Sequence, residues 1–221
     1  MRMWCRAVRL HVRTRSLSSL VNFERASPHL DRSLVHVWPE VITEEEEQRL
    51  FDELAALLRR RRYSKSHWDS VIVKFRETER AWASWEEENQ ATLRRMRKIV
   101  TETLGEDNMN AFMGGAHVVD IAAEGYISPH VDSTKASGNF IAGLSLLSDC
   151  EMTLRHRAGM SEGDGWNVEL DDDSVVDVKL PRRSLYLLRG ELRFEYTHAL
   201  SVEARRISII FRDQANGDDV A

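Results

Sequence analysis

The first helix-forming pattern covers residues 43–62. Its apolar residues recur every three or four positions, so they form one stripe along a helix whose other faces are charged. Thr43 and Glu46 have the spacing of a capping box, and acidic residues crowd the first turn, where the helix dipole favours them. Arginines 59–62 crowd the last turn for the same reason, with contact to phosphate groups as the alternative role. We therefore expect an amphipathic helix that packs its leucine stripe on a sheet.

A second amphipathic helix is predicted over residues 84–104. Ser84 and Glu87 again have capping-box spacing, and Gly105 is a natural stop because glycine readily adopts the left-handed conformation that ends helices. The segment between the two helices is mixed in character. Its large aromatic side chains are expected to pack in the core or in a lid rather than to stack on bases. They are Trp68, Phe75 and Trp82.

From residue 116 onwards the pattern changes to short runs rich in β-branched and aromatic residues, separated by turns. Glu124–Gly125 and residues 171–174 are expected to form hairpin turns, and Pro181 marks another. Many short strands without helices between them indicate a mainly β fold with flanking helices, arranged as a sandwich or jelly roll. The predicted strands are Ala116–Ala122, Ile127–Asp132, Ile141–Leu147, Met152–Arg157, Trp166–Leu170, Val175–Lys179, Ser184–Leu188, Phe194–Ala199 and Arg205–Phe211.

The composition fits one folded domain. The chain has 221 residues, of which 42% are hydrophobic and 30% charged, enough for one core of good size. No apolar run approaches the length that a bilayer span needs, so we expect no membrane span. Cys5 and Cys150 are the only cysteines, and Cys5 lies in a basic leader. The mature chain is therefore expected to hold no internal disulfide, as is usual in a reducing compartment.

Residues 1–25 are predicted to be a mitochondrial transit peptide. They are rich in arginine and serine and contain no acidic residue before Glu24. A basic disordered tail that binds nucleic acid is the alternative. We expect cleavage between about residues 20 and 35, a domain over residues 34–213 and a short tail over 214–221. Without residues 1–25, which hold six basic residues and one acidic residue, the formal net charge shifts from −5 to about −10, so the mature protein is expected to be acidic.

The candidate chemistry centres on a His-x-Asp motif. His130 and Asp132 place an imidazole and a carboxylate on the same side of an extended segment, because strand side chains repeat every second residue. His198, on a later strand-like run, is the best third ligand. Two histidines and one carboxylate with open positions opposite form the ligand set of non-haem Fe(II) oxygenases. The same spacing at His29–Asp31 and His67–Asp69 is interpreted as an accident of composition.

The last strand-like run carries two arginines on one face. Arg206 and Arg212 are an even number of residues apart, so in a strand both side chains point to the same side. If that side is buried, the guanidinium groups need an anionic partner, since an unpaired buried charge is very costly. A small dicarboxylate bound beside the metal would supply that partner. The alternative is a strand face exposed to solvent.

Together these residues resemble the AlkB family of Fe(II)- and 2-oxoglutarate-dependent dioxygenases, and especially its mitochondrial members in animals. The resemblance covers about residues 34–213. It implies a double-stranded β-helix, a jelly-roll or cupin-like fold, in which the two N-terminal helices support the outside of the major sheet. Besides the metal motif, the distal histidine and the arginine pair, it rests on Arg60–Tyr63, His67–Asp69, Phe75–Glu79, Gly125–Ile127, Ile141–Ser148 and Ser184–Gly190.

The resemblance also implies the cofactors and their contacts. The two histidines and the aspartate named above would be the catalytic residues that bind Fe(II), with O2 at the remaining metal position. Arg206 would pair with the distal carboxylate of 2-oxoglutarate, and Arg212 would lie nearer its other end. The hydroxyl of Tyr186 would donate to a carboxylate oxygen, with strand packing as the alternative role.

The chain departs from the nucleic-acid repair members of the family in three places. Those members carry an Asn-x-Tyr pair where this chain reads Asp120-Ile121-Ala122, so this contact to 2-oxoglutarate is expected to be lost or moved. His117 could take it over or be an ordinary core residue. Little hairpin pattern precedes the jelly roll, so no nucleotide-recognition lid is expected. The short connection from His198 to Arg206 predicts a trimmed loop on the substrate side.

These departures leave three hypotheses for the function. The first is a dioxygenase of the mitochondrial matrix that oxidises a protein or another non-duplex substrate, with a role in fatty-acid metabolism and programmed necrosis that the resemblance implies. The second is demethylation of methylated bases in mitochondrial RNA, whereas duplex DNA is not expected as a partner. An acidic protein disfavours nonspecific phosphate binding, although a local basic groove would permit it. The third is a partner-binding module with little turnover.

Overall fold

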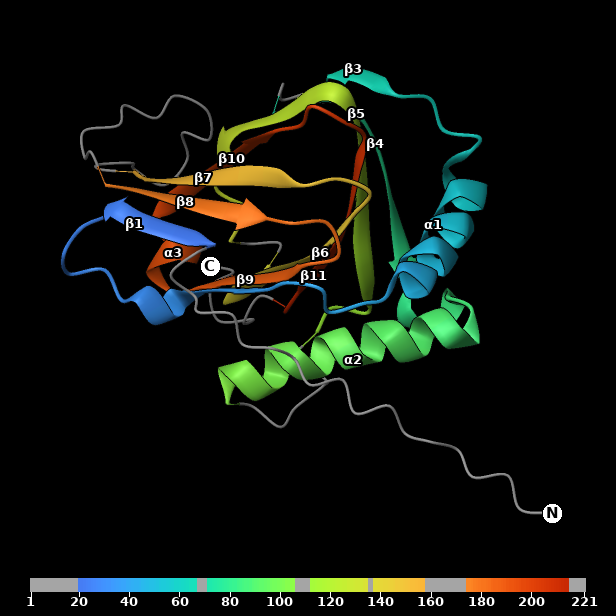
Figure 1. Ribbon diagram of the computed structural model, residues 1–221, viewed down its shortest axis with the longest axis horizontal. Coiled ribbons are helices and arrows are strands. Elements are labelled where there is room, and N and C mark those ends of the chain that lie inside the picture. The colour runs from blue at the N-terminus through green and yellow to red at the C-terminus, as the bar shows by residue number, and fades with distance from the viewer. Residues whose placement is uncertain (1–19, 67–70, 106–111, 135–136, 158–173, 215–221) are drawn as a thin grey trace, which may run out of the picture.

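In the residues that the structure describes, eleven strands form one antiparallel sheet that curls into an almost closed barrel (Figure 1). The computed structural model describes residues 20–66, 71–105, 112–134, 137–157 and 174–214. The strands are β1 (Val21–Arg25), β2 (Val35–Trp38), β3 (Ser64–Ser66), β4 (Ile72–Ala81), β5 (Gly115–His130), β6 (Phe140–Leu146), β7 (Cys150–His156), β8 (Val175–Leu180), β9 (Leu185–Arg189), β10 (Tyr196–Ser201) and β11 (Arg206–Arg212). The helices are α1 (Glu44–Leu58), α2 (Glu87–Leu104) and α3 (Glu191–Phe194), with the 3₁₀ helices η2 (Arg32–Leu34) and η3 (Trp82–Ser84).

The strand order arranges the barrel around one long strand, β5. Neighbouring strands follow the order β1-β8-β7-β10-β5-β11-β6-β9-β2, while β4 also pairs with β5 and β3 pairs with β4. The first part of β5 pairs with β11 and its last residues pair with β10, while β4 pairs with both parts. The mainly β fold with flanking helices that the sequence predicts is confirmed.

A bend inside β5 takes this strand from one half of the barrel to the other. Glu124 has a positive φ of 60°, and Gly125 leaves room beside it, because a Cβ atom there would lie 2.4 Å from the side chain of Ile121. The hairpin turn predicted at this point is wrong. Backbone hydrogen bonds join Glu124 and Gly125 to Val202 at 2.9 and 3.0 Å, so the strand bends but keeps its partners and continues to His130.

Both long helices pack on the outer face of the sheet (Figure 1). Ile207, Ile209 and Phe211 of β11 face the helices, so the residues between them face the barrel interior. Burying each such side chain contributes about 1.5–3 kcal/mol relative to leaving it exposed. The predicted leucine stripe supplies much of this core, whose helix residues are Leu50, Leu54, Leu58, Leu93, Met96 and Val100.

Helix α1 begins as predicted and ends earlier. The capping box of Thr43 and Glu46 is present, with both reciprocal hydrogen bonds. The helix stops at Leu58, before the arginine run, because Arg76 of β4 donates to the carbonyl oxygens of Leu58 at 2.9 Å and Arg61 at 3.1 Å. A guanidinium from the sheet therefore satisfies carbonyl groups at the end of the helix.

Helix α2 begins three residues later than predicted, after Glu86, and the predicted capping role of Ser84 is wrong. Residues 82–84 form η3 instead. The carboxylate of Glu53 in α1 accepts from the backbone N–H of Glu86 at 3.1 and 3.2 Å and from the Asn89 amide at 2.7 Å. A carboxylate from the neighbouring helix thus satisfies the backbone N–H of the N-cap residue and lies at the positive end of the helix dipole. The predicted stop at Gly105 is confirmed by its positive φ of 74°.

The segment before β5 forms a hairpin, which the sequence did not predict. β3 and β4 pair in antiparallel fashion, and β4 continues along β5 from Ile72 to Ala81. Phe75 is buried in the barrel and Trp82 stacks on Phe211 with ring centroids 5.6 Å apart, as expected of core aromatics. Trp68 lies outside the described residues.

Two further boundaries differ from the prediction. Val21–Arg25, assigned to the leader, forms β1 and pairs with β8. The predicted strand that starts at Phe194 begins two residues later, because residues 191–194 form the short helix α3. The predicted strand Trp166–Leu170, most of the predicted turn at 171–174 and most of the leader lie outside the described residues.

None of the described helices is long and apolar enough to cross a membrane.

Asp120 ties the α1 end to the sheet and points away from the barrel interior. It lies on β5 in the same alternation as Val118, which packs on the helices. Its carboxylate is fully buried and accepts from Arg76 at 2.7 Å, from Arg205 at 2.9 Å through two nitrogens, and from the Tyr63 hydroxyl at 3.0 Å. Asp120 is therefore a structural residue and not a candidate for contact with 2-oxoglutarate.

Replacing Asp120 by Asn is expected to lower the free energy of unfolding by about 3 kcal/mol, because two guanidinium groups lose their shared buried anion. Urea unfolding measures this loss. Glu124→Gln is the matched control, since it removes a carboxylate from the exposed pair with Lys74 and is expected to leave stability near that of the wild type. A loss for Asp120→Asn no larger than that of the control would contradict the assignment.

Candidate metal centre

The structure brings the three predicted metal ligands together. His130 is the last residue of β5 and lies opposite His198 of β10 in the strand register. Asp132 follows two residues later, and its Oδ1 lies 3.3 Å from Nε2 of His130 and 3.7 Å from Nε2 of His198. Within the described ranges this is the one group of His, Cys, Asp or Glu whose ligand atoms all lie within 4.8 Å of one another.

The backbone sets the tautomer of His130. Its Nδ1 lies 2.9 Å from the carbonyl oxygen of Ser128, an oxygen that can only accept. Nδ1 therefore carries the proton and Nε2 keeps its lone pair. Nε2 with this lone pair faces Asp132, so it is available to a metal. In metal sites the other ring nitrogen of a ligating histidine commonly donates to a carbonyl or carboxylate oxygen, as Nδ1 does here, and this bond orients the ring.

Arg212 orients the carboxylate of Asp132. Its Nε and Nη2 donate to Oδ2 at 2.8 and 2.6 Å, which leaves Oδ1 directed at the two imidazoles. Burial by itself would raise the pKa of Asp132, but the His130 imidazole beside its carboxylate and the positive charge of Arg212 outweigh burial and hold this pKa well below its usual range. Asp132 is therefore an anion at neutral pH.

His198 is a neutral imidazole at neutral pH. Burial, followed by repulsion from His130, lowers the pKa of His198 to about 3. The two imidazole rings lie 4.1 Å apart between centroids. Two imidazole nitrogens and one carboxylate oxygen that converge on one point fit a divalent metal of the first transition series.

The second predicted group lies further along the interior side of β11. Arg206 is 1% exposed and donates to Oγ of Ser145 at 2.6 Å and to the carbonyl of Ser148 at 3.1 Å. Its Nε has no partner, and no carboxylate among the described residues forms an ion pair with it. A buried cation that has only neutral partners is costly, so this part of the interior favours a bound anion.

Tyr186 reaches the same part of the interior from β9. It pairs with Gly143 of β6, which pairs in turn with Ile210 of β11. Gly143 is required there, because a Cβ atom would lie 2.4 Å from the Tyr186 ring. Burial raises the pKa of Tyr186 to about 12, so its hydroxyl remains a donor at neutral pH. This hydroxyl makes no hydrogen bond to another described residue.

Arg193 is a residue of the site that sequence reasoning missed. It is 2% exposed and donates to the carbonyl of Asp132 at 3.0 Å and to Oγ of Ser137 at 2.8 Å. It therefore holds the segment that follows the metal motif. In the sequence, the feature that could have pointed to this residue is a charged side chain between the apolar Leu192 and Phe194, in a turn where an apolar residue is the usual buried choice.

Comparison with known proteins gives the family of the chain. No protein-family model matches the chain. The mouse (Mus musculus) protein named alpha-ketoglutarate-dependent dioxygenase alkB homolog 7, mitochondrial, is 37% identical over 199 residues, which cover 85% of this chain and 80% of the relative. The protein of the same name from Bos taurus is 37% identical over 193 residues, which cover 82% of this chain and 79% of the relative. The chain belongs to the AlkB family of dioxygenases.

Solved structures support the fold of this AlkB-family chain. OsALKBH1 has a TM-score of 0.58 at 12% identity, with 83% of this chain and 100% of that chain covered. A prolyl-4-hydroxylase from Pseudomonas putida has a TM-score of 0.57 at 12% identity, with 83% and 94% covered. At this identity the likeness shows the fold alone. The predicted double-stranded β-helix is confirmed.

Membership of the AlkB family also gives the class of enzyme and its cofactors. The chain is a dioxygenase that depends on Fe(II), 2-oxoglutarate and O2, as predicted, and the His-Asp-His group fits the iron. The hypothesis of a binding module with little turnover is correspondingly disfavoured. Both relatives are named as mitochondrial proteins.

Mn(II), which resists oxidation, is expected to stabilise the metal-free protein. At a metal concentration about 100 times Kd, the free energy of unfolding should rise by about 2.7 kcal/mol, because metal binds the folded chain alone. His198→Ala should abolish the rise. His29→Ala removes an exposed histidine of the accidental His-x-Asp spacing and should leave the rise unchanged. Equal stabilisation of wild type and His198→Ala, measured by urea unfolding, would contradict the assignment.

Proposed function

We propose that this chain is a mitochondrial oxygenase in which His130, Asp132 and His198 hold the catalytic iron. The convergence of the three donors and the charge states of Asp132 and His198 at neutral pH support this role. When bound, Fe(II) with 2-oxoglutarate and O2 supplies the oxidation that forms succinate and CO2 and oxidises the substrate. The protein's part is to hold the donors in place and to keep the imidazole lone pairs free of protons.

Arg206 is proposed to bind the distal carboxylate of 2-oxoglutarate. The observation that carries this proposal is a buried guanidinium without a carboxylate partner in the described part of the chain. Its planar group suits two parallel hydrogen bonds to a carboxylate. Tyr186 would add a hydroxyl donor. Arg212 would contact the other end of the molecule, since each of its terminal nitrogens has a second N–H beyond the bond to Asp132 or His117.

The substrate is proposed to be a protein or another non-duplex molecule in the mitochondrial matrix. The connection between β10 and β11 spans only residues 202–205, which favours an open front, and the acidic charge disfavours a polyanion. A role in fatty-acid metabolism and programmed necrosis stays a prediction from the resemblance. Since Val21 of β1 is buried against β8, we place transit-peptide cleavage at the early end of the expected range, before this strand.

Methylated mitochondrial RNA is the second candidate substrate, and the β3–β4 hairpin favours it. The side chains of Arg59, Arg60, Arg61 and Arg62, just before this hairpin, and of Lys65 in β3 are basic and exposed. Tyr63 lies between them and is 37% exposed. β4 pairs with β5 at Ile127, close in the chain to His130. A basic segment with an exposed aromatic residue can bind a single strand of nucleic acid.

The cofactor site predicts a visible charge-transfer band when Fe(II) and 2-oxoglutarate are added without O2. His130→Ala should lose the band because a metal ligand is missing, and Arg206→Ala because the dicarboxylate is released. Arg206→Lys should keep the charge but bind 2-oxoglutarate at least about 10-fold more weakly, since lysine lacks the planar fork. Arg25→Ala, at an exposed ion pair, should behave as wild type. No band in folded wild type would overturn the proposal.

Binding of folded RNA at several salt concentrations separates the two substrates. If RNA binds along the basic segment, replacing Arg60, Arg61 and Arg62 by Gln should weaken binding and flatten the salt dependence by about one unit of slope per lost phosphate contact. Arg94→Gln, on the exposed side of α2, is the control. An absence of binding even at low salt would eliminate RNA and leave the protein substrate.

A further inference from the structure

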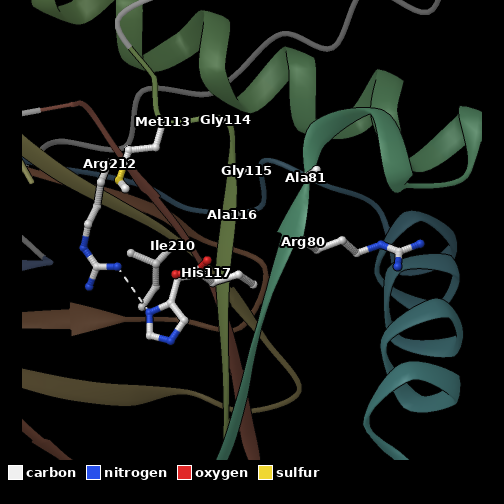
Figure 2. A pocket seen from close by; sticks show the side chains of 10 residues that line it. Arg80, Ala81, Met113, Gly114, Gly115, Ala116, His117, Ile210 and Arg212 are labelled. Atoms are coloured by element: carbon white, nitrogen blue, oxygen red, sulfur yellow. Dashed lines mark hydrogen bonds between the residues drawn. The ribbon is translucent and has the colours of Figure 1, made fainter. Parts of the chain in front are cut away.

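A chain of polar contacts runs from the outer strand β4 to the metal ligand Asp132. Nε2 of His117 lies 2.8 Å from a carboxylate oxygen of Glu77, and its Nδ1 lies 3.2 Å from Nη1 of Arg212. Arg212 in turn holds Asp132. Figure 2 shows the side chains of His117 and Arg212 facing each other. Both residues line a cavity of about 270 Å³. The network joins β4, β5 and β11 to Asp132 in the loop after β5.

Only one tautomer of a neutral His117 satisfies both neighbours. Arginine nitrogens carry only donors, so Nδ1 of His117 has to accept and cannot carry a proton. The proton of a neutral ring is then on Nε2, where it donates to the carboxylate of Glu77. Glu77 therefore selects the form of His117 that can receive Arg212.

With this contact, every guanidinium nitrogen of Arg212 is held. Nε and Nη2 donate to Oδ2 of Asp132 and Nη1 donates to His117. Because the guanidinium group is planar, fixing it at both sides fixes the direction from which it holds Asp132. Without His117, the guanidinium could turn about its bond to Cδ and draw the carboxylate away from the two imidazoles.

We propose that Glu77 and His117 are positioning residues that lock Arg212 and, through it, present Oδ1 of Asp132 to the metal. This inference rests on the proposed metal centre. His117 touches neither the metal ligands nor the bound metal in this role. It acts as residues behind a metal ligand commonly do, by orienting that ligand.

The test is the affinity of the metal-free protein for Co(II) alone, followed by the visible bands of the bound ion. His117→Leu removes the acceptor and is expected to weaken Co(II) binding about 10- to 100-fold. His117→Asn is its matched partner of similar size, and its Oδ1 can take the place of Nδ1. It is expected to bind within about threefold of wild type. Unfolding of the metal-free variants shows whether a change is merely structural.

A second pair of variants tests the outer end of the network. Glu77→Leu should weaken Co(II) binding about 3- to 10-fold, because His117 is then free to adopt the wrong tautomer. Glu102→Leu, at an exposed position on α2, should bind as wild type. Because Glu77 is only partly buried, this pair remains informative if His117→Leu does not fold.

The possible outcomes are distinct. Weak binding by His117→Leu with recovery in His117→Asn supports the inference. Equal affinity of His117→Leu and wild type, or equal loss in the Leu and Asn variants, overturns it and leaves the metal centre intact. If the wild type fails to bind Co(II), the proposed centre itself fails, and the positioning role fails with it.

Discussion

The ion pair between Arg212 and Asp132 is the interaction on which the site depends. It joins the end of β11 to the loop after β5 and decides which oxygen of Asp132 faces the two histidines. The same pair keeps this buried carboxylate ionised against the cost of burial. One guanidinium therefore does two things for the metal centre: it sets the geometry of a ligand and it sets its charge.

Charge in the barrel interior explains the preference for an anionic co-substrate. Arg206 and Arg193 are almost fully buried, and neither forms an ion pair with a carboxylate among the described residues. Carbonyl and hydroxyl oxygens solvate them only in part. Arg193 holds the loop after Asp132, and the Nε atoms of both arginines have no hydrogen-bond partner. A dianion bound beside a divalent metal would balance the positive charge of these buried arginines. An uncharged molecule of the same size would not.

The shape of the sheet brings these charges to one place. The bend at Glu124 lets β5 pair first with β11 and then with β10, so His130 meets His198 although the two residues are far apart in the sequence. Helices α1 and α2 cover the outer face, which leaves the alternate residues of β11 for the interior. The buried cluster around Asp120 fastens this outer layer to the sheet and is thereby separated from the cofactor chemistry inside.

The sequence by itself determined the elements that follow from local rules and from motif spacing. Neighbouring residues are enough to predict these elements, because side-chain period and backbone preference act locally. They are the capping box at Thr43, the helix stop at Gly105, the alternation along β11 and the His-x-Asp motif at His130. Tertiary structure alone decided the continuation of β5 through Glu124, the β3–β4 hairpin, the first turn of α2, and the use of Arg193 and His117. Each of these depends on a partner distant in the chain: Val202 for the bend, β5 for the hairpin, Glu53 for the helix start, the carbonyl of Asp132 for Arg193 and Arg212 for His117. No local pattern specifies which distant group satisfies a buried donor or acceptor.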